Sequence, residues 1–166
     1  MLNLSVFLED SARRYPTKDA FVFMDVHLTY AQVNGAANQI ANGLVAAGIR
    51  PGDKVALSCL NVPYFPMVYF GILKAGAVVV PLSVLLKRDE VEYHLKDADA
   101  KAYFCFLGAP GLPMLEEGHA GFLNTEACKD LYVITEKPTD ASPIDGLKTM
   151  GMLMHGQSPA AETVAT

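Results

Sequence analysis

Side chains that could carry out chemistry are present in this sequence, but their spacing fits no known catalytic or metal-binding arrangement. The four histidines lie far apart, and none has a partner at the spacing of a zinc site or a general-base pair. These histidines are His27, His94, His119 and His155. We therefore predict structural roles for most of them, no catalytic residue and no metal site.

The three cysteines are an odd number with no C-x-x-C pair, which is typical of reduced, buried thiols. They are Cys59, Cys105 and Cys128. Cys105 lies among aromatic residues, where burial would raise its pKa and suppress its reactivity. Cys59 follows a predicted strand, at the sheet edge where open α/β sheets bind ligands, but packing remains the favoured interpretation.

Other candidate groups also have simpler explanations. Asp89, Glu90 and Glu92 could form a carboxylate cluster, yet acidic residues in the first turn of a helix complement its dipole. The segment 108–111, Gly-Ala-Pro-Gly, could be a ligand loop after a strand, although its composition favours a turn. Neither the phosphate loop G-x-x-x-x-G-K-[ST] nor the dinucleotide motif G-x-G-x-x-G occurs.

The composition is that of one globular domain. The chain has 166 residues, of which 51% are hydrophobic and 19% charged, with a formal net charge of −5. Such apolar content excludes intrinsic disorder, and an acidic chain without a basic cluster argues against a nucleic acid partner.

Membrane insertion and secretion are not favoured by the sequence. The first residues lack a basic region, and Glu9 and Asp10 interrupt any apolar signal segment. Val55–Leu73 carries no formal charge and approaches the roughly 20 residues that span a bilayer. Pro63 and Pro66 divide it, however, so we predict no transmembrane segment and a cytoplasmic location.

Hydrophobic periodicity predicts alternating helices and strands. The pattern Thr29-x-x-Gln32 predicts a capping box at the start of a helix that Gly48 ends, and Ala77–Val80 predicts a strand buried on both faces. The expected helices lie at 4–15, 30–47, 64–75 and around 91–98, and the expected strands at 20–24, 55–58, 77–80, 101–106 and 131–135.

This alternation predicts the α/β class, with a mainly parallel sheet and helices on both faces. We predict one domain over 1–137 and a linker-like tail over 138–166, with one short helical turn around Leu147–Met154.

Three segments resemble the adenylate-forming, AMP-binding enzymes, which include acyl-CoA synthetases, luciferases and nonribosomal adenylation domains. Leu28–Val33 resembles the signature L-[TS]-Y-x-[EQ]-[LV], and Leu73–Ser83 resembles L-K-A-G-A-x-x-x-P-[LI]-[ND]. Gly48–Ala56 resembles the link between these signatures, and the similarity extends over about 4–135. These segments are most similar to those of bacterial long-chain fatty-acyl-CoA synthetases. The resemblance implies that the chain forms the N-terminal subdomain of the acyl-CoA synthetase fold.

The resemblance implies a ligase that uses ATP, Mg²⁺ and coenzyme A to convert a carboxylic acid, here a fatty acid, to its acyl-CoA. The family's phosphate loop and later catalytic motifs match no position in this sequence, which stops at Thr163–Thr166 before that loop. We therefore expect an inactive fragment whose partner is the rest of the ligase polypeptide and whose exposed apolar face drives self-association. The alternatives are a stand-alone binding or protein-interaction module and an unrelated α/β ligand binder.

One site is implied by the resemblance alone. Ser83, Val84 and Leu85 lie in a loop that resembles a region near the coenzyme A channel of some relatives. The alternative is a strand-to-helix turn that fills the core. Two departures from the family pattern are Ser83, where Asn or Asp is usual, and Pro66, where relatives continue a helix.

Overall fold

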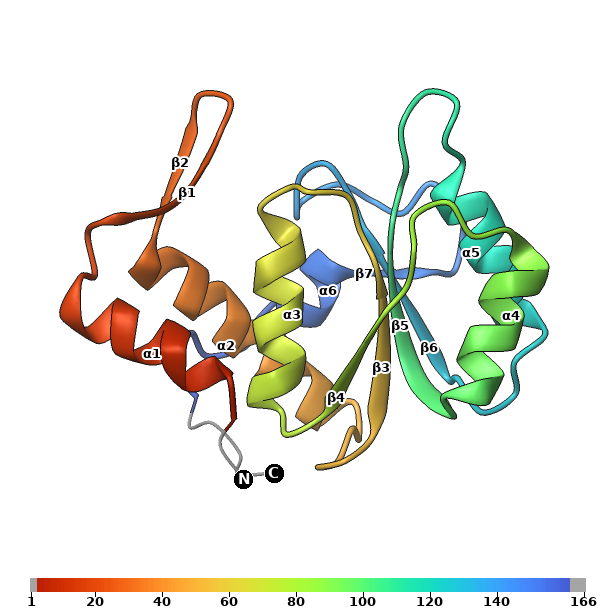
Figure 1. The fold of residues 1–166 in the computed structure, drawn as a ribbon, viewed down its shortest axis with the longest axis horizontal. Coiled ribbons are helices and arrows are strands. Elements are labelled where there is room, and N and C mark those ends of the chain that lie inside the picture. The colour runs from red at the N-terminus through yellow and green to blue at the C-terminus, as the bar shows by residue number, and fades with distance from the viewer. Residues whose placement is uncertain (1–2, 162–166) are drawn as a thin grey trace. The chain divides into compact units, whose positions relative to one another are not determined.

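The computed structural model describes residues 3–161, which form two compact units (Figure 1). One unit comprises the chain up to Gly52, Asn61–Val78 and the chain from Met154. The other comprises Asp53–Leu60 and Val79–Leu153. Each unit is therefore assembled from separate stretches of sequence.

The first unit contains three helices and a β-hairpin. These elements are α1 (Ser5–Arg14), β1 (Asp19–Phe23), β2 (Val26–Thr29), α2 (Tyr30–Ala46) and α3 (Tyr64–Lys74). The predicted capping box is confirmed at the start of α2. Thr29 Oγ1 accepts a hydrogen bond from Gln32 N at 3.3 Å, and Gln32 Oε1 accepts one from Thr29 N at 2.9 Å.

Close packing of α2 on α3 defines the core of the first unit. The buried apolar face of α2 consists of Val33, Ala37, Ile40, Ala41 and Leu44. A Cβ atom on Gly71 of α3 would lie only 2.6 Å from Ile40 Cγ2. Glycine at this position therefore allows an approach between the helices that any side chain would prevent.

The predicted strand at 20–24 exists as β1, but it pairs with a second strand that the sequence did not reveal. Phe21 lies opposite Leu28 and Phe23 opposite Val26 in an antiparallel hairpin. This two-stranded sheet is separate from the main sheet.

The second unit is built on a five-stranded sheet in the order β4-β3-β5-β6-β7. The strands are β3 (Lys54–Ser58), β4 (Val78–Pro81), β5 (Ala100–Phe106), β6 (Asp130–Ile134) and β7 (Lys148–Thr149). The pairs β3 with β5, β5 with β6 and β6 with β7 are all parallel. The predicted α/β class with a mainly parallel sheet is confirmed.

Helices α4 (Arg88–Asp97) and α5 (Met114–Leu123) pack against one another beside this sheet (Figure 1). A Cβ atom on Gly121 of α5 would lie 2.6 Å from the backbone oxygen of Arg88 and 2.9 Å from the backbone nitrogen of Glu92. The absent side chain thus brings the two helix backbones together. Sequence periodicity did not reveal α5.

The strand predicted at 77–80 forms as β4, but the prediction that it is buried on both faces is wrong. Its burial is partial, and Val78 is 46% exposed. The reason is its place at the edge of the sheet, next to β3 alone. A run of β-branched residues thus indicates a strand without fixing whether it is central.

The predicted tail contains both a strand and a helix. β7 extends the sheet beside β6, and it leads into α6 (Met150–Met154), the helical turn expected around 147–154. Residues 162–166 of the predicted tail, including Thr163–Thr166, lie outside the described residues.

The uncharged stretch Val55–Leu73 is divided between β3 and α3, as its prolines indicated. Within residues 3–161, no helix is long and apolar enough to cross a membrane.

Candidate functional site

The carboxyl ends of the strands of the second unit meet at one edge of the sheet. Leu82 N, directly after β4, donates to Leu57 O near the end of β3 at 2.9 Å. Ser58 at the end of β3 lies opposite Cys105, and Phe106 at the end of β5 lies opposite Ile134. Ligands of open α/β sheets bind at this edge, so its loops are the candidate site.

The loop after β4 contains the residues that the family resemblance singled out. Ser83 and Leu85 are exposed, and Val84 is half-buried. Ser83 Oγ accepts a hydrogen bond from Leu85 N at 3.3 Å, which closes a turn before α4. The structure therefore gives Ser83 a conformational role, and a role in binding coenzyme A stays a prediction.

The loop after β5 is a tight turn around an open hollow of about 510 Å³. Ala109 and Leu112 exchange backbone hydrogen bonds of 3.1 and 2.8 Å. Gly108 has φ +114°, and a Cβ atom there would lie 2.2 Å from the oxygen of Leu112. The segment 108–111 is thus a turn, and its hollow has Glu116 as its charged lining residue.

The cysteines lie in or near this sheet, and their thiols are unreactive. Burial raises the pKa values of Cys59, Cys105 and Cys128 to about 12 each. A thiol with such a pKa is almost entirely protonated at neutral pH and is a poor nucleophile. The predicted burial of all three is confirmed.

A buried hydroxyl pair lies under the candidate edge and was not singled out from the sequence. The oxygens of Ser58 on β3 and Tyr103 on β5 are 2.7 Å apart. Burial is the main reason that the pKa of Tyr103 lies well above its usual value. The pair crosslinks neighbouring strands and is closed to a substrate, since both side chains are buried.

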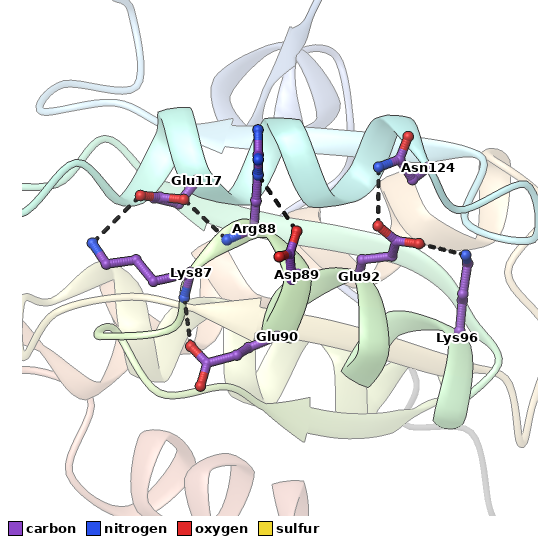
Figure 2. Close-up of polar contacts among 8 residues, drawn as sticks. All are labelled: Lys87, Arg88, Asp89, Glu90, Glu92, Lys96, Glu117 and Asn124. Carbon is purple, nitrogen blue, oxygen red and sulfur yellow. Dashed lines mark hydrogen bonds and ion pairs between the residues drawn. The ribbon is translucent and has the colours of Figure 1, made fainter.

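The carboxylates of α4 take part in a polar network with α5 (Figure 2). Glu90 accepts a hydrogen bond from Lys87 N at 2.8 Å, and Glu92 accepts from Lys96 Nζ at 2.6 Å and from Asn124 Nδ2 at 2.9 Å. Glu92 and Lys96, four residues apart on α4, thus form an ion pair. These bonds lower the pKa of Glu92, with Lys96 the largest cause.

Glu117 of α5 fastens the start of α4 in the same network (Figure 2). Its carboxylate accepts a hydrogen bond from Arg88 N at 3.0 Å and lies 3.4 Å from Lys87 Nζ. The backbone N–H of Arg88 is the main cause of the lowered pKa of Glu117. The network fixes α4 against α5, and its carboxylates already have cationic or N–H partners.

The histidines do not assemble into a site. His27 lies 2.6 Å from Asp19 on the exposed hairpin, and the half-buried His94 packs edge-on against Tyr93. Within residues 3–161, no group of three or more His, Cys, Asp or Glu side chains could hold a metal ion.

Comparison with known proteins decides the family. The chain matches the family described as AMP-binding enzyme over residues 8–160. The chain belongs to the AMP-binding enzymes. Long-chain-fatty-acid–CoA ligase FadD13 of Mycobacterium tuberculosis is 38% identical over 118 residues. That alignment covers 70% of this chain but only 23% of FadD13, so the chain spans less than a quarter of this relative's length.

Solved structures of similar proteins share the fold. The anthranilate CoA ligase AuaEII, in complex with anthranoyl-AMP, has a TM-score of 0.84 and 28% identity over 98% of this chain and 30% of its own. The N-terminal domain of FACL13 from M. tuberculosis has a TM-score of 0.77 and 29% identity over 100% of this chain and 38% of its own. The chain thus has the N-terminal fold of acyl-CoA ligases.

Proposed function

We propose that this chain is the N-terminal portion of an ATP-dependent acyl-CoA synthetase that acts on a fatty acid. The carboxylate of the acid attacks the α-phosphate of ATP to give an acyl-adenylate and pyrophosphate, and the thiol of coenzyme A then displaces AMP. The match to the AMP-binding family over residues 8–160 carries the proposal. The identity to a long-chain fatty-acid ligase supports the substrate class.

The chain by itself is proposed to be inactive. Its sequence holds no phosphate loop, its three thiols are buried, and the carboxylates of Glu90 and Glu117 are bound in structural contacts. Its part in the reaction is to support the site, with ATP, Mg²⁺ and coenzyme A bound chiefly by the rest of a cytoplasmic ligase. An apolar face left without that remainder promotes self-association.

An activity assay and a size measurement test these statements together. The purified chain, mixed with ATP, Mg²⁺ and carboxylic acids from short to long chain, is expected to release no pyrophosphate. An antibody against residues 1–135 is expected to detect a band well above 17.9 kDa in the source cells. Acyl-adenylate formed by the chain alone would overturn its inactivity, and a sole band at 17.9 kDa would favour a stand-alone binding module.

The loop at 83–85 is proposed to border the path of coenzyme A in the whole ligase. The exposure of Ser83 and Leu85 at the carboxyl edge of the sheet supports this position. Leu85→Ala in the whole ligase is expected to raise the KM for coenzyme A several-fold and leave the KM for ATP unchanged. Leu123→Ala, which truncates an equally exposed leucine on α5, is the matched control. An unchanged KM for coenzyme A in Leu85→Ala would contradict the assignment.

A further inference from the structure

A row of amide side chains on α2 holds a stretch of backbone that lies far away in the sequence. The amide row consists of Asn38, Gln39 and Asn42, and it donates to the carbonyl oxygens of four consecutive residues, 157–160. Gln39 Nε2 donates to Gln157 O at 3.2 Å, and Asn38 Nδ2 to Pro159 O at 2.7 Å. Asn42 Nδ2 donates to Ser158 O at 2.9 Å and to Ala160 O at 3.1 Å.

All four contacts are made to the main chain. A carbonyl oxygen is present in every residue, so these hydrogen bonds recognise the position of the backbone and not the side chains of residues 157–160. Gly35 of α2 lies beside the segment, and a Cβ atom there would make an ordinary contact of 3.7 Å with Pro159 Cβ. The surface is therefore suited to backbone in this register.

The burial of Asn38 indicates that this residue does more than fill the core. Asn38 is only 4% exposed, and its Oδ1 has no hydrogen-bond partner among the residues that the structure describes. The buried Oδ1 of Asn34, one helical turn before Asn38, likewise has no hydrogen-bond partner among the described residues. Burying such acceptors is unfavourable, so an apolar residue would fill this space better if packing were the sole requirement.

We propose that the amide row is a main-chain clamp whose occupant is segment 157–160 of the same chain. The clamp fixes the register of this segment on α2 and so sets the point from which the chain continues after Ala160. It acts within the first unit, which contains both α2 and the chain from Met154. This inference does not depend on the proposed ligase activity.

Limited proteolysis of the intact chain tests the clamp. Elastase cleaves after small residues, and cleavage after Ala160 requires the carbonyl group of Ala160 to leave Asn42. Asn42→Asp keeps the side-chain shape but removes the N–H donors for two carbonyl oxygens. We expect roughly tenfold faster cleavage after Ala160, measured by mass spectrometry, with an unchanged circular dichroism spectrum. Asn38→Asp is expected to act in the same direction.

Two controls separate a clamp from a general loss of stability. Gln157→Ala removes a side chain of the segment but keeps its carbonyl, and Asn124→Asp makes the same amide-to-acid change in the second unit. Both are expected to leave the cleavage rate within about twofold of the original chain. If Asn38→Asp does not fold, the cleavage rate of Asn42→Asp alone tests the clamp. An unchanged rate in folded Asn42→Asp, or equal acceleration in Gln157→Ala, would overturn the proposal.

Discussion

The ammonium group of Lys74, on α3, donates to the carboxylate of Glu9, on α1, and the Lys74 side chain has no exposed surface. Burial lowers the pKa of Lys74, and the contact with Glu9 opposes that shift. Asn3 Nδ2 donates to Leu73 O at 2.7 Å next to this pair. The buried ammonium group of Lys74 thus binds α1 to the end of α3, and its charge is stabilised by the carboxylate of Glu9.

Removal of the carboxylate should therefore destabilise the first unit. Glu9→Ala leaves a buried ammonium without its anion, and breaking buried pairs costs about 3–5 kcal/mol. Because Glu9 is one-third exposed, water partly compensates, and we expect a loss of about 2 kcal/mol in urea unfolding. The double variant Glu9→Gln/Lys74→Met should recover most of that loss. A single variant as stable as the original chain would show that the pair contributes nothing.

The contact between α4 and α5 should tolerate no side chain at Gly121. Gly121→Ala places a Cβ atom against two backbone atoms of α4, and these atoms cannot move without displacing the helix. We expect a loss of about 2–3 kcal/mol in thermal unfolding, as for other overpacked contacts. Gly35→Ala is the matched helical control, because its Cβ meets only an ordinary contact. It should stabilise by about 0.5–1 kcal/mol through helix propensity.

Stability should fall in alkaline solution. The thiol pKa is 9.0 in the unfolded chain and about 12 in the fold for Cys59, Cys105 and Cys128. The folded state then holds more protons, so stability is full below pH 9 and is lost as the pH rises toward 12. Each thiol contributes about 1.4 kcal/mol per pH unit. Tyr103, whose pKa is also raised, acts in the same direction.

Lys74 provides the opposing contribution to this pH dependence. Because the pKa of Lys74 is lowered in the fold, Lys74 loses its proton at a lower pH in the folded chain than in the unfolded chain. This difference favours folding as the pH rises. One lysine is outweighed by three thiols, so urea midpoints measured from pH 8 to 11 should decrease. Cys128→Ala removes one of the three thiols and should therefore reduce the slope of the urea midpoint against pH. Midpoints independent of pH in this range would contradict the raised thiol pKa values.

The capping box should account for a measurable part of the stability of α2. Thr29→Ala removes the oxygen that accepts the Gln32 N–H, and loss of such a cap costs about 1 kcal/mol. Thr29→Ser keeps the hydroxyl and should retain most of the stability. Chemical denaturation of the two variants side by side measures the difference, and equal losses would assign the effect to the threonine methyl group.

Long elements with a clear apolar period were predictable from the sequence, whereas elements held by tertiary contacts were not. α2 and β5 have unambiguous patterns, but the buried face of α5 includes Gly118 and Gly121, which sequence reasoning treats as helix breakers. A Cβ atom on Gly118 would lie 2.8 Å from Cys105 Sγ and from the Tyr103 hydroxyl. Both glycines are required by neighbours that no local window contains.

The second hairpin strand was missed for a different reason. β2 is only four residues long, and the turn before it, around Met24 with φ +51°, lacks the glycine or asparagine that normally indicates a tight hairpin. The amide row likewise depends on the pairing of Asn38 with Pro159, 121 residues apart. The alternation of helices and strands indicated the fold class and the motifs indicated the family, while the loop at 83–85 came from resemblance and not from local chemistry.

The division of the sequence between the two units has a consequence for how the protein is made. The chain passes from one unit to the other at Gly52, Leu60, Val78 and Leu153. No single cut can therefore release either unit intact. During synthesis, the three helices of the first unit leave the ribosome long before Met154. That unit must remain incomplete until the chain has been translated through Leu153, the last residue of the second unit, and until then the amide row of α2 lacks its backbone partner.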